Sequence, residues 1–131
     1  MLYDLFIHLN QIKVNMKNIP FQFLNWDHVP KEEHPGETGT SYWQTMSFGG
    51  LRLRIVEYSA GYLADHWCQK GHIVYCIEGS FDTHLETGEC ITLDKGKMYI
   101  VSDEMSSHKS FSKSGVKLFI IDGDFLAEKK E

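Results

Sequence analysis

The sequence contains no run of apolar residues that approaches the roughly 18 residues of a membrane-spanning helix. It also has no excess of basic residues, since its formal net charge is −5 at pH 7. Nucleic acids and anionic membrane surfaces both require a basic surface on the protein that binds them. We therefore expect neither a membrane nor a nucleic acid as a partner.

Cysteine is scarce, and the number of cysteines is odd: the chain has only Cys68, Cys76 and Cys90. The N-terminal stretch places Asp4 where a signal peptide would carry positive charge, and it has no small-residue cleavage site. An odd number of cysteines without export features favours reduced thiols over a disulfide framework. This pattern predicts a cytoplasmic protein.

The length and composition of the sequence are those of one globular domain. Its 131 residues, 42% of them hydrophobic, can bury a core without help from a disulfide or a structural metal. Met16 is a second plausible start, so we interpret residues 1–15 as an N-terminal extension, either an over-long start, a short added helix or an exchanged segment. Residues 16–131 are then predicted to form a single domain.

Hydrophobic residues alternate with polar ones from Leu51 onward. The stretches LRLRIVEY and HIVYCIEG each predict one strand, the second closed by Gly79, and further short strands follow up to Asp122. Turn signals separate them at intervals of about 8–12 residues, which is typical of an antiparallel sandwich or barrel. The sequence therefore predicts an all-β fold from about Gln44 to Asp122.

Helices are expected to be few and short. The segment 27–40, DHVPKEEHPGETGT, is polar and contains two prolines and two glycines, so we predict a surface loop there. At most one or two short helices are expected, near the N-terminus or in this loop.

The stretch DHWCQKGHIVYCIEG, residues 65–79, gathers metal-binding side chains in what is otherwise the pattern of a buried strand. With the preceding glycine it follows the spacing G-x4-H-x-C-x3-H-x6-G, which resembles the first sequence motif of the cupin family. Cysteine stands in place of the second histidine of that motif, and histidine in place of its glutamate. The positions that carry this resemblance are Gly61, His66, Cys68, His72 and Gly79.

A second stretch, LDKGKMYIVSDEMSSH, resembles the second cupin motif, with Gly96 as its glycine and His108 as its histidine. Ser102 and Glu104 stand where that motif has proline and glycine. More closely, the run from GETGTSYW through ADHWCQKGHI to GVKLFIID resembles small single-domain cupins with an Asp-His-Cys-Trp motif. The resemblance implies a cupin-type antiparallel β-barrel or jelly-roll sandwich.

The resemblance also implies one metal site, with His66, Cys68, His72 and His108 as its candidate ligands. On a strand, His66 and Cys68 would point to the same face, and Gly71 would permit a bend that brings His72 beside them. Three imidazoles and a thiolate suit a divalent transition metal, zinc, iron, nickel or copper, better than Mg²⁺ or Ca²⁺.

Three further residues are candidates for the wall of a pocket: Tyr58, Trp43 and Cys76. Tyr58 shares one face of its predicted strand with Arg52 and Arg54. In the interior these arginines would give the pocket an anion-binding side, whereas on the exterior they would be ordinary solvated charges. The exterior is the preferred interpretation.

The leading functional hypothesis is a small cytoplasmic cupin whose pocket binds a divalent metal and a small organic molecule, as a substrate or a ligand. No specific reaction follows from the sequence. Two alternatives stay open: a metal-free binding or sensor protein without enzymatic activity, and a closed zinc site that only stabilises the barrel. We also expect a homodimer, because the edge strands of an open sandwich need cover.

Overall fold

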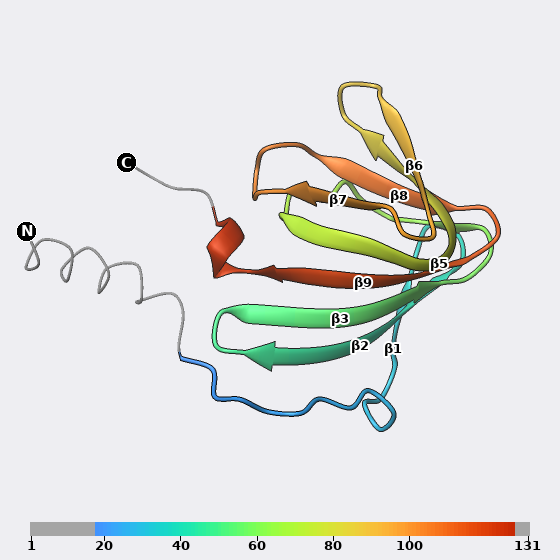
Figure 1. Cartoon of the computed structure of the whole chain (residues 1–131). Helices are drawn as coiled ribbons and strands as arrows, with labels where there is room; N and C mark the ends of the chain where they lie inside the picture. Colours follow the sequence, from blue (N-terminus) through green and yellow to red (C-terminus); the bar gives the residue numbers. More distant parts are fainter. Residues whose placement is uncertain (1–17, 128–131) are drawn as a thin grey trace, which may run out of the picture.

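The computed structural model describes residues 18–127, which form nine β-strands and one 3-10 helix (Figure 1). The elements in chain order are β1 (Glu32–Pro35), β2 (Thr40–Phe48), β3 (Leu51–Tyr58), β4 (Tyr62–Leu63), β5 (His72–Leu85), β6 (Cys90–Asp94), β7 (Met98–Val101), β8 (His108–Ser112), β9 (Val116–Gly123) and the 3-10 helix η1 (Asp124–Leu126). The predicted all-β fold is confirmed. No helix in the described residues is long and apolar enough to span a membrane.

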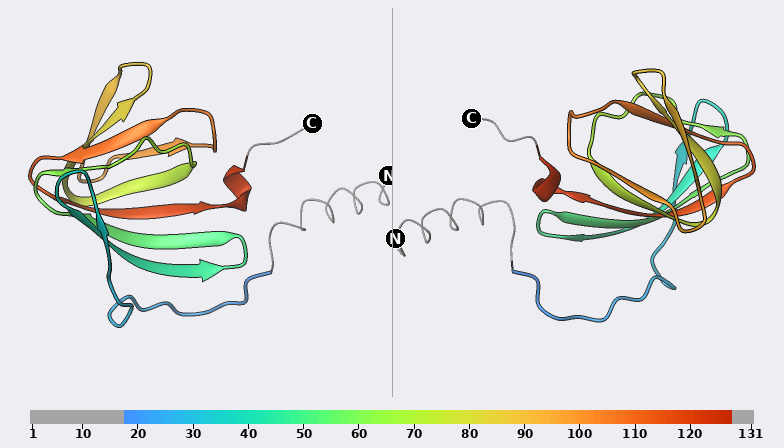
Figure 2. Two further views of the ribbon diagram at one scale, coloured as in Figure 1. Left: turned by 180° about the vertical axis from the view of Figure 1, so that it is seen from behind. Right: turned by 45° about the horizontal axis from the view of Figure 1, so that its top comes forward.

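All strand pairings are antiparallel, in the order β1-β2-β3-β9-β5-β8-β4, and β6 and β7 also pair with β5. The two views of Figure 2 show that this sheet curls over on itself. Strands that are far apart in the sequence thereby face one another across a common interior, as in a barrel.

β5 is one bent strand, whereas the sequence predicted two strands separated at Gly79. Its first half pairs with β7 and β9, and its second half pairs with β6 and β8. The register with β9 shifts between Cys76 and Glu78, and Gly79 has a φ of 83°. A Cβ at Gly79 would lie 2.4 Å from the carbonyl oxygen of Gly115. Gly79 therefore permits the bend that carries β5 round the barrel.

The segment 27–40 is not only a loop, because it contains β1. This strand pairs with the start of β2, and the ring of His34 stacks on Trp43 with 3.9 Å between centroids. The short helix of the described residues also lies elsewhere than predicted, after β9. The proposed N-terminal extension, residues 1–15, lies outside the described residues.

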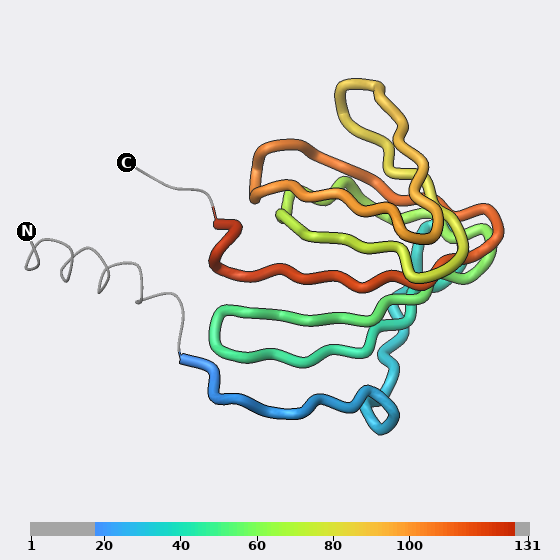
Figure 3. Tube along the Cα trace, in the orientation of Figure 1, coloured from blue at the N-terminus to red at the C-terminus, as the bar shows by residue number. Residues whose placement is uncertain are grey.

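The chain before β1 passes below β2 in an extended conformation (Figure 3). Gln44 of β2 holds it by donating hydrogen bonds from Nε2 to the carbonyl oxygens of Trp26 and Val29, at 2.9 and 2.8 Å. The body of the fold thus begins at the turn before β1.

The hydrophobic core lies inside the curled sheet. Its buried members are Val56, Val74, Cys76, Phe81, Leu93, Val116, Leu118 and Ile120. In β9 every second residue is buried, and the same alternation brings Asp122 into the interior at the end of the strand. An acidic side chain therefore lies where the pattern calls for an apolar one.

Candidate metal centre and cavity

Cys68 and His108 lie directly opposite each other. The amide of Cys68 donates to the carbonyl of His108 at 2.8 Å, and the amide of His108 donates to the carbonyl of Cys68 at 3.0 Å. This isolated antiparallel bridge connects the stretch before β5 to the first residue of β8. The backbone therefore holds these two candidate ligand residues opposite each other.

Gly71 fixes the approach of the third candidate ligand, His72, which begins β5. A Cβ at Gly71 would lie 2.5 Å from the carbonyl oxygen of Val101, so a larger residue would push the chain away. The amide of Gly71 also donates to Asp103 at 2.6 Å. The glycine is required here by close approach of the backbone.

These three side chains converge. One ligand atom from each of Cys68, His72 and His108 lies within 4.8 Å of the others. The Sγ of Cys68 is 3.5 Å from Nε2 of His72, and the two imidazole rings stand edge to face with 5.4 Å between centroids. This separation suits three side chains that share one ion.

His108 has a free nitrogen in the interior. Its Nδ1 donates to the carbonyl oxygen of Ser106 at 3.1 Å, while its Nε2 is buried without a hydrogen-bond partner. Burial lowers the pKa of His108, which favours the neutral imidazole. A buried nitrogen with an unshared lone pair is what a metal ligand presents in the absence of the metal.

His72 is oriented by a carboxylate that the sequence analysis missed. Its Nδ1 donates to Oδ2 of Asp122 at 2.9 Å, which leaves Nε2 directed at Cys68. Metal-binding histidines commonly donate their other ring nitrogen to a carboxylate in this way, because the bond fixes the tautomer and the ring orientation.

Asp122 is in turn held by two arginines. Arg52 binds both carboxylate oxygens, at 2.8 and 2.9 Å, and Arg54 donates to Oδ2 at 2.8 Å. Burial acts to raise the pKa of Asp122, but the hydrogen bonds from His72 and Arg52 and the charges of the arginines outweigh it and hold this pKa well below its ordinary value. Asp122 is therefore an ionised carboxylate in the interior of the barrel.

The preferred exterior position of the arginines was wrong. The side chain of Arg54 is only 5% exposed and that of Arg52 is 31% exposed, and both line a partly open cavity of about 170 Å³. The face of β3 that carries Val56 is the buried one, and Asp122 on the neighbouring strand supplies the charge that lets the arginines share it. The alternation of β9 was the one sequence signal that pointed to Asp122.

His66 does not join the group of three. Residues 64–71 bend instead of forming a strand, so the same-face expectation for His66 and Cys68 does not hold. The side chain of His66 is 73% exposed, and its Nδ1 is 2.6 Å from the carboxylate of Asp65. It lies along the wall of the cavity, apart from the three converging ligand atoms.

The three predicted pocket residues fall into two places. Trp43 and Tyr58 line the cavity, together with His72 and His108. Cys76 is instead buried in the hydrophobic core and does not line the cavity.

No protein-family model matches this sequence, and no curated protein matches it closely enough to be a relative. Solved structures do match. A structure of ectoine synthase from P. lautus is 17% identical, with 83% of this chain and 80% of that chain covered and a TM-score of 0.65. An RmlC-like cupin from Shewanella frigidimarina is 18% identical, with coverages of 79% and 91% and a TM-score of 0.64.

A predicted oxalate decarboxylase from Thermotoga maritima gives a TM-score of 0.67 at 11% identity, and the match covers 79% of this chain and all of that one. These identities are low, so the likeness establishes the fold alone. The chain has the cupin fold, as the two sequence motifs implied.

Proposed function

We propose that this protein is a single-domain cupin that binds one divalent transition metal through Cys68, His72 and His108 and holds a small organic molecule beside it. The observation that carries the proposal is the convergence of three ligand atoms within 4.8 Å around the partnerless Nε2 of His108. A thiolate and two imidazoles suit zinc, iron, nickel or copper. Structural neighbours that carry enzyme names, an ectoine synthase and a predicted oxalate decarboxylase, support a small organic molecule as the ligand or substrate.

The proposed open metal site, the closed zinc site and the metal-free protein differ in how many ligands the chain supplies to a metal. Three protein ligands would leave a coordination position for water or for the organic molecule, where a metal supplies Lewis-acid polarisation or dioxygen activation. A closed structural zinc site would need a fourth protein ligand, and His66 at the cavity wall is the residue that the cupin motif offers. A protein that takes up no metal would be the metal-free binding protein.

The test is elemental analysis after reconstitution with Zn²⁺, Fe²⁺, Ni²⁺ and Mn²⁺. We expect about one metal ion per wild-type chain and almost none in His108→Ala, while His28→Ala, which changes an exposed histidine outside the site, keeps it. His66→Ala distinguishes the open site from the closed one, because only a closed site loses its metal with His66. Equal metal content in wild type and His108→Ala would refute the proposal.

A second candidate function follows from the line of Cys68, His72 and Asp122. A thiol 3.5 Å from an imidazole that a carboxylate orients is the arrangement of a cysteine nucleophile with its base. Burial acts to raise the pKa of Cys68, but the hydrogen bonds to His72 and to the backbone of Lys70, together with the charges of His72 and Arg54, outweigh it and hold this pKa below its ordinary value. The check is the rate at which iodoacetamide labels Cys68 in metal-free protein. A rate no faster than that of the exposed Cys90 would exclude this candidate.

We also propose that the protein is a cytoplasmic homodimer. Its three cysteines are free, which agrees with a reducing compartment. Ile91, Met98 and Ile100 are exposed on β6 and β7, which follow each other in the chain, and a second copy would cover them. Sedimentation at micromolar concentration tests the dimer, and a monomer alone would contradict it.

A further inference from the structure

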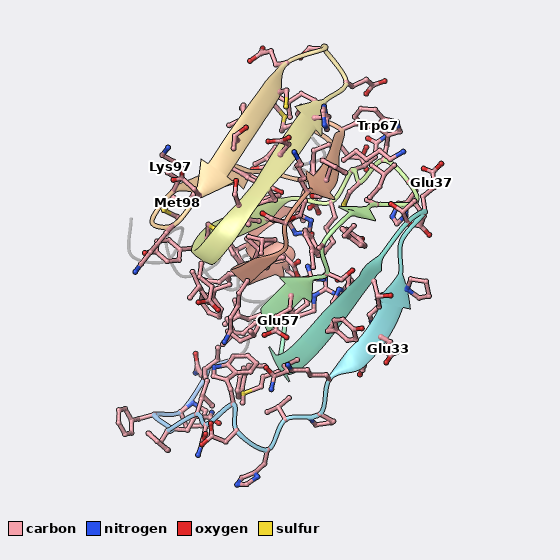
Figure 4. The ribbon with its side chains drawn as sticks, turned by 90° about the vertical axis from the view of Figure 1, so that its right-hand side faces the viewer. Glu33, Glu37, Glu57, Trp67, Lys97 and Met98 are labelled. Atoms are coloured by element: carbon pink, nitrogen blue, oxygen red, sulfur yellow. The ribbon has the colours of Figure 1, made fainter. Side chains whose placement is uncertain are left out.

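The charge of the cavity is opposite to that of the chain. Among the described residues that line it, four side chains are basic and none is acidic. The basic residues are Arg52, Arg54, Lys70 and Lys109. Lys109 has an acidic neighbour, Glu37, at 3.7 Å, but Glu37 does not line the cavity. Its side chain is exposed at the edge of the molecule (Figure 4). A chain with a net charge of −5 thus surrounds a basic cavity.

The two arginines of the cavity outnumber their acidic partner, which does not itself line the cavity. Two guanidinium groups, those of Arg52 and Arg54, share the single carboxylate of Asp122. Arg52 donates two hydrogen bonds to this carboxylate, from Nε and Nη2, whereas Arg54 donates only one, from Nη2. The Nε of Arg54 is buried without a hydrogen-bond partner. A buried donor of a charged group without a partner indicates an acceptor that arrives from elsewhere.

Trp43 holds Arg54 in a fixed position. The guanidinium carbon of Arg54 lies 4.4 Å from the centre of the Trp43 ring. Stacking on an aromatic ring leaves the edge of a guanidinium free for in-plane hydrogen bonds, and a flat carboxylate matches that edge with two parallel bonds. On Arg54 the unpartnered donor is Nε, since Nη2 already bonds to Asp122, and one added carboxylate group matches this single donor better than a larger, more highly charged anion.

Part of the remaining cavity wall is apolar. Val56, Val74, Phe81, Leu118 and Ile120 contribute to it. The cavity volume of about 170 Å³ is close to that of an apolar cavity known to hold benzene, so a ligand of that size fits within it. Such a wall accepts a short hydrocarbon body attached to the charged group.

We propose that the cavity binds a small organic carboxylate, with its carboxylate on Arg54 and its hydrocarbon body against the apolar wall. The inference rests on the proposed function, since it identifies the chemical class of the molecule held beside the metal. The ligand site and the metal site use different residues, so the two can be tested separately.

The probe is 3-methylbutanoate, and its neutral isostere 3-methylbutanamide is the comparison. Isothermal titration calorimetry of each into metal-free and into zinc-loaded wild-type protein measures the two dissociation constants. We expect the carboxylate to bind at least tenfold more tightly than the amide in both forms. This comparison uses the wild-type chain and does not depend on a variant that folds. Inorganic phosphate is titrated in parallel, and tighter binding of phosphate would overturn the assignment to a carboxylate.

The variant is Arg54→Met, which keeps a side chain of similar length and removes the charge. We expect it to weaken the carboxylate at least tenfold and to change the amide less than threefold. Lys113→Met is the matched control, because it removes one positive charge from an exposed residue that does not line the cavity. Circular dichroism of both variants verifies that the β fold is retained.

The outcomes separate this inference from the proposed function. Zinc bound at one ion per chain with equal affinity for carboxylate and amide would refute the carboxylate site and leave the metal site intact. A preference for the carboxylate in a protein that takes up no metal would refute the metal site and leave the carboxylate site intact. A preference that appears only with zinc and survives Arg54→Met would mean that the carboxylate binds to the metal, which also overturns the inference.

Discussion

Asp122→Asn tests the central electrostatic argument, because one carboxylate orients His72 and neutralises the buried Arg54. Asp122 is 0% exposed and accepts hydrogen bonds from His72, Arg52 and Arg54. Removing one partner of a buried ion pair costs about 3–5 kcal/mol, since it leaves an uncompensated charge in the interior. The amide oxygen of asparagine still accepts one of these bonds, so we expect the lower end, about 3 kcal/mol.

Urea denaturation measures this loss. With a slope of about 2 kcal/mol per molar urea, a loss of about 3 kcal/mol lowers the midpoint by about 1.5 M. Asp94→Asn is the matched control, because Asp94 is 55% exposed and pairs with Lys97 on the surface at 3.3 Å. A surface pair contributes about 0–1 kcal/mol, so this control should shift the midpoint by about 0.5 M or less.

The same variant also reports on the metal site. Loss of the carboxylate that orients a metal-binding histidine typically lowers metal affinity about 10–100-fold, which competition with a chelator measures for zinc. Equal urea midpoints for Asp122→Asn and Asp94→Asn would refute the claim that Asp122 is a buried counter-ion. An unchanged zinc affinity would refute its role in orienting His72.

Three other predictions address single residues. Cys68→Ser should shift the metal preference from zinc toward Mn²⁺, because a hydroxyl is a poor soft ligand, and an unchanged ratio of the two metals in competitive loading would argue against a Cys68 ligand. Metal-free protein should lose stability as the pH falls below about 6.5, because burial lowers the pKa of His108 in the folded protein and the unfolded chain therefore takes up the proton first. Urea midpoints measured between pH 7.5 and 5 should fall less steeply with pH in His108→Gln than in wild type. Gly79→Ala should destabilise the fold by more than about 1 kcal/mol, since its φ of 83° and the 2.4 Å approach to Gly115 both oppose a Cβ, whereas Gly88→Ala lacks the close approach and should lose less in the same measurement.

Local periodicity accounts for the elements that the sequence predicted well. The alternation in LRLRIVEY gave a strand at 51–58, and β3 spans Leu51–Tyr58. The cupin motifs gave the fold and pointed to Cys68, His72 and His108, which converge in the structure. These signals are readable because they depend on residue type and spacing along a short stretch of chain.

Other features needed the packed molecule. Residues 64–71 bend, and Gly71 at their end lies against Val101, a contact that joins segments about 30 residues apart. The bend separates His66 from Cys68, which strand spacing alone had put together. β1 within 27–40 likewise exists only because β2 supplies its hydrogen-bond partners.

The sequence by itself determined the all-β class, the period of most strands and the residue types that can bind a metal. Only the tertiary structure decided which face of β3 is buried, since an arginine can be interior only where another strand provides a counter-charge. That charge comes from Asp122, 68 residues beyond Arg54, on the strand that pairs with β3. The basic cavity and the orientation of His72 both follow from this one pairing, because the energy of a buried charge depends on neighbours in space.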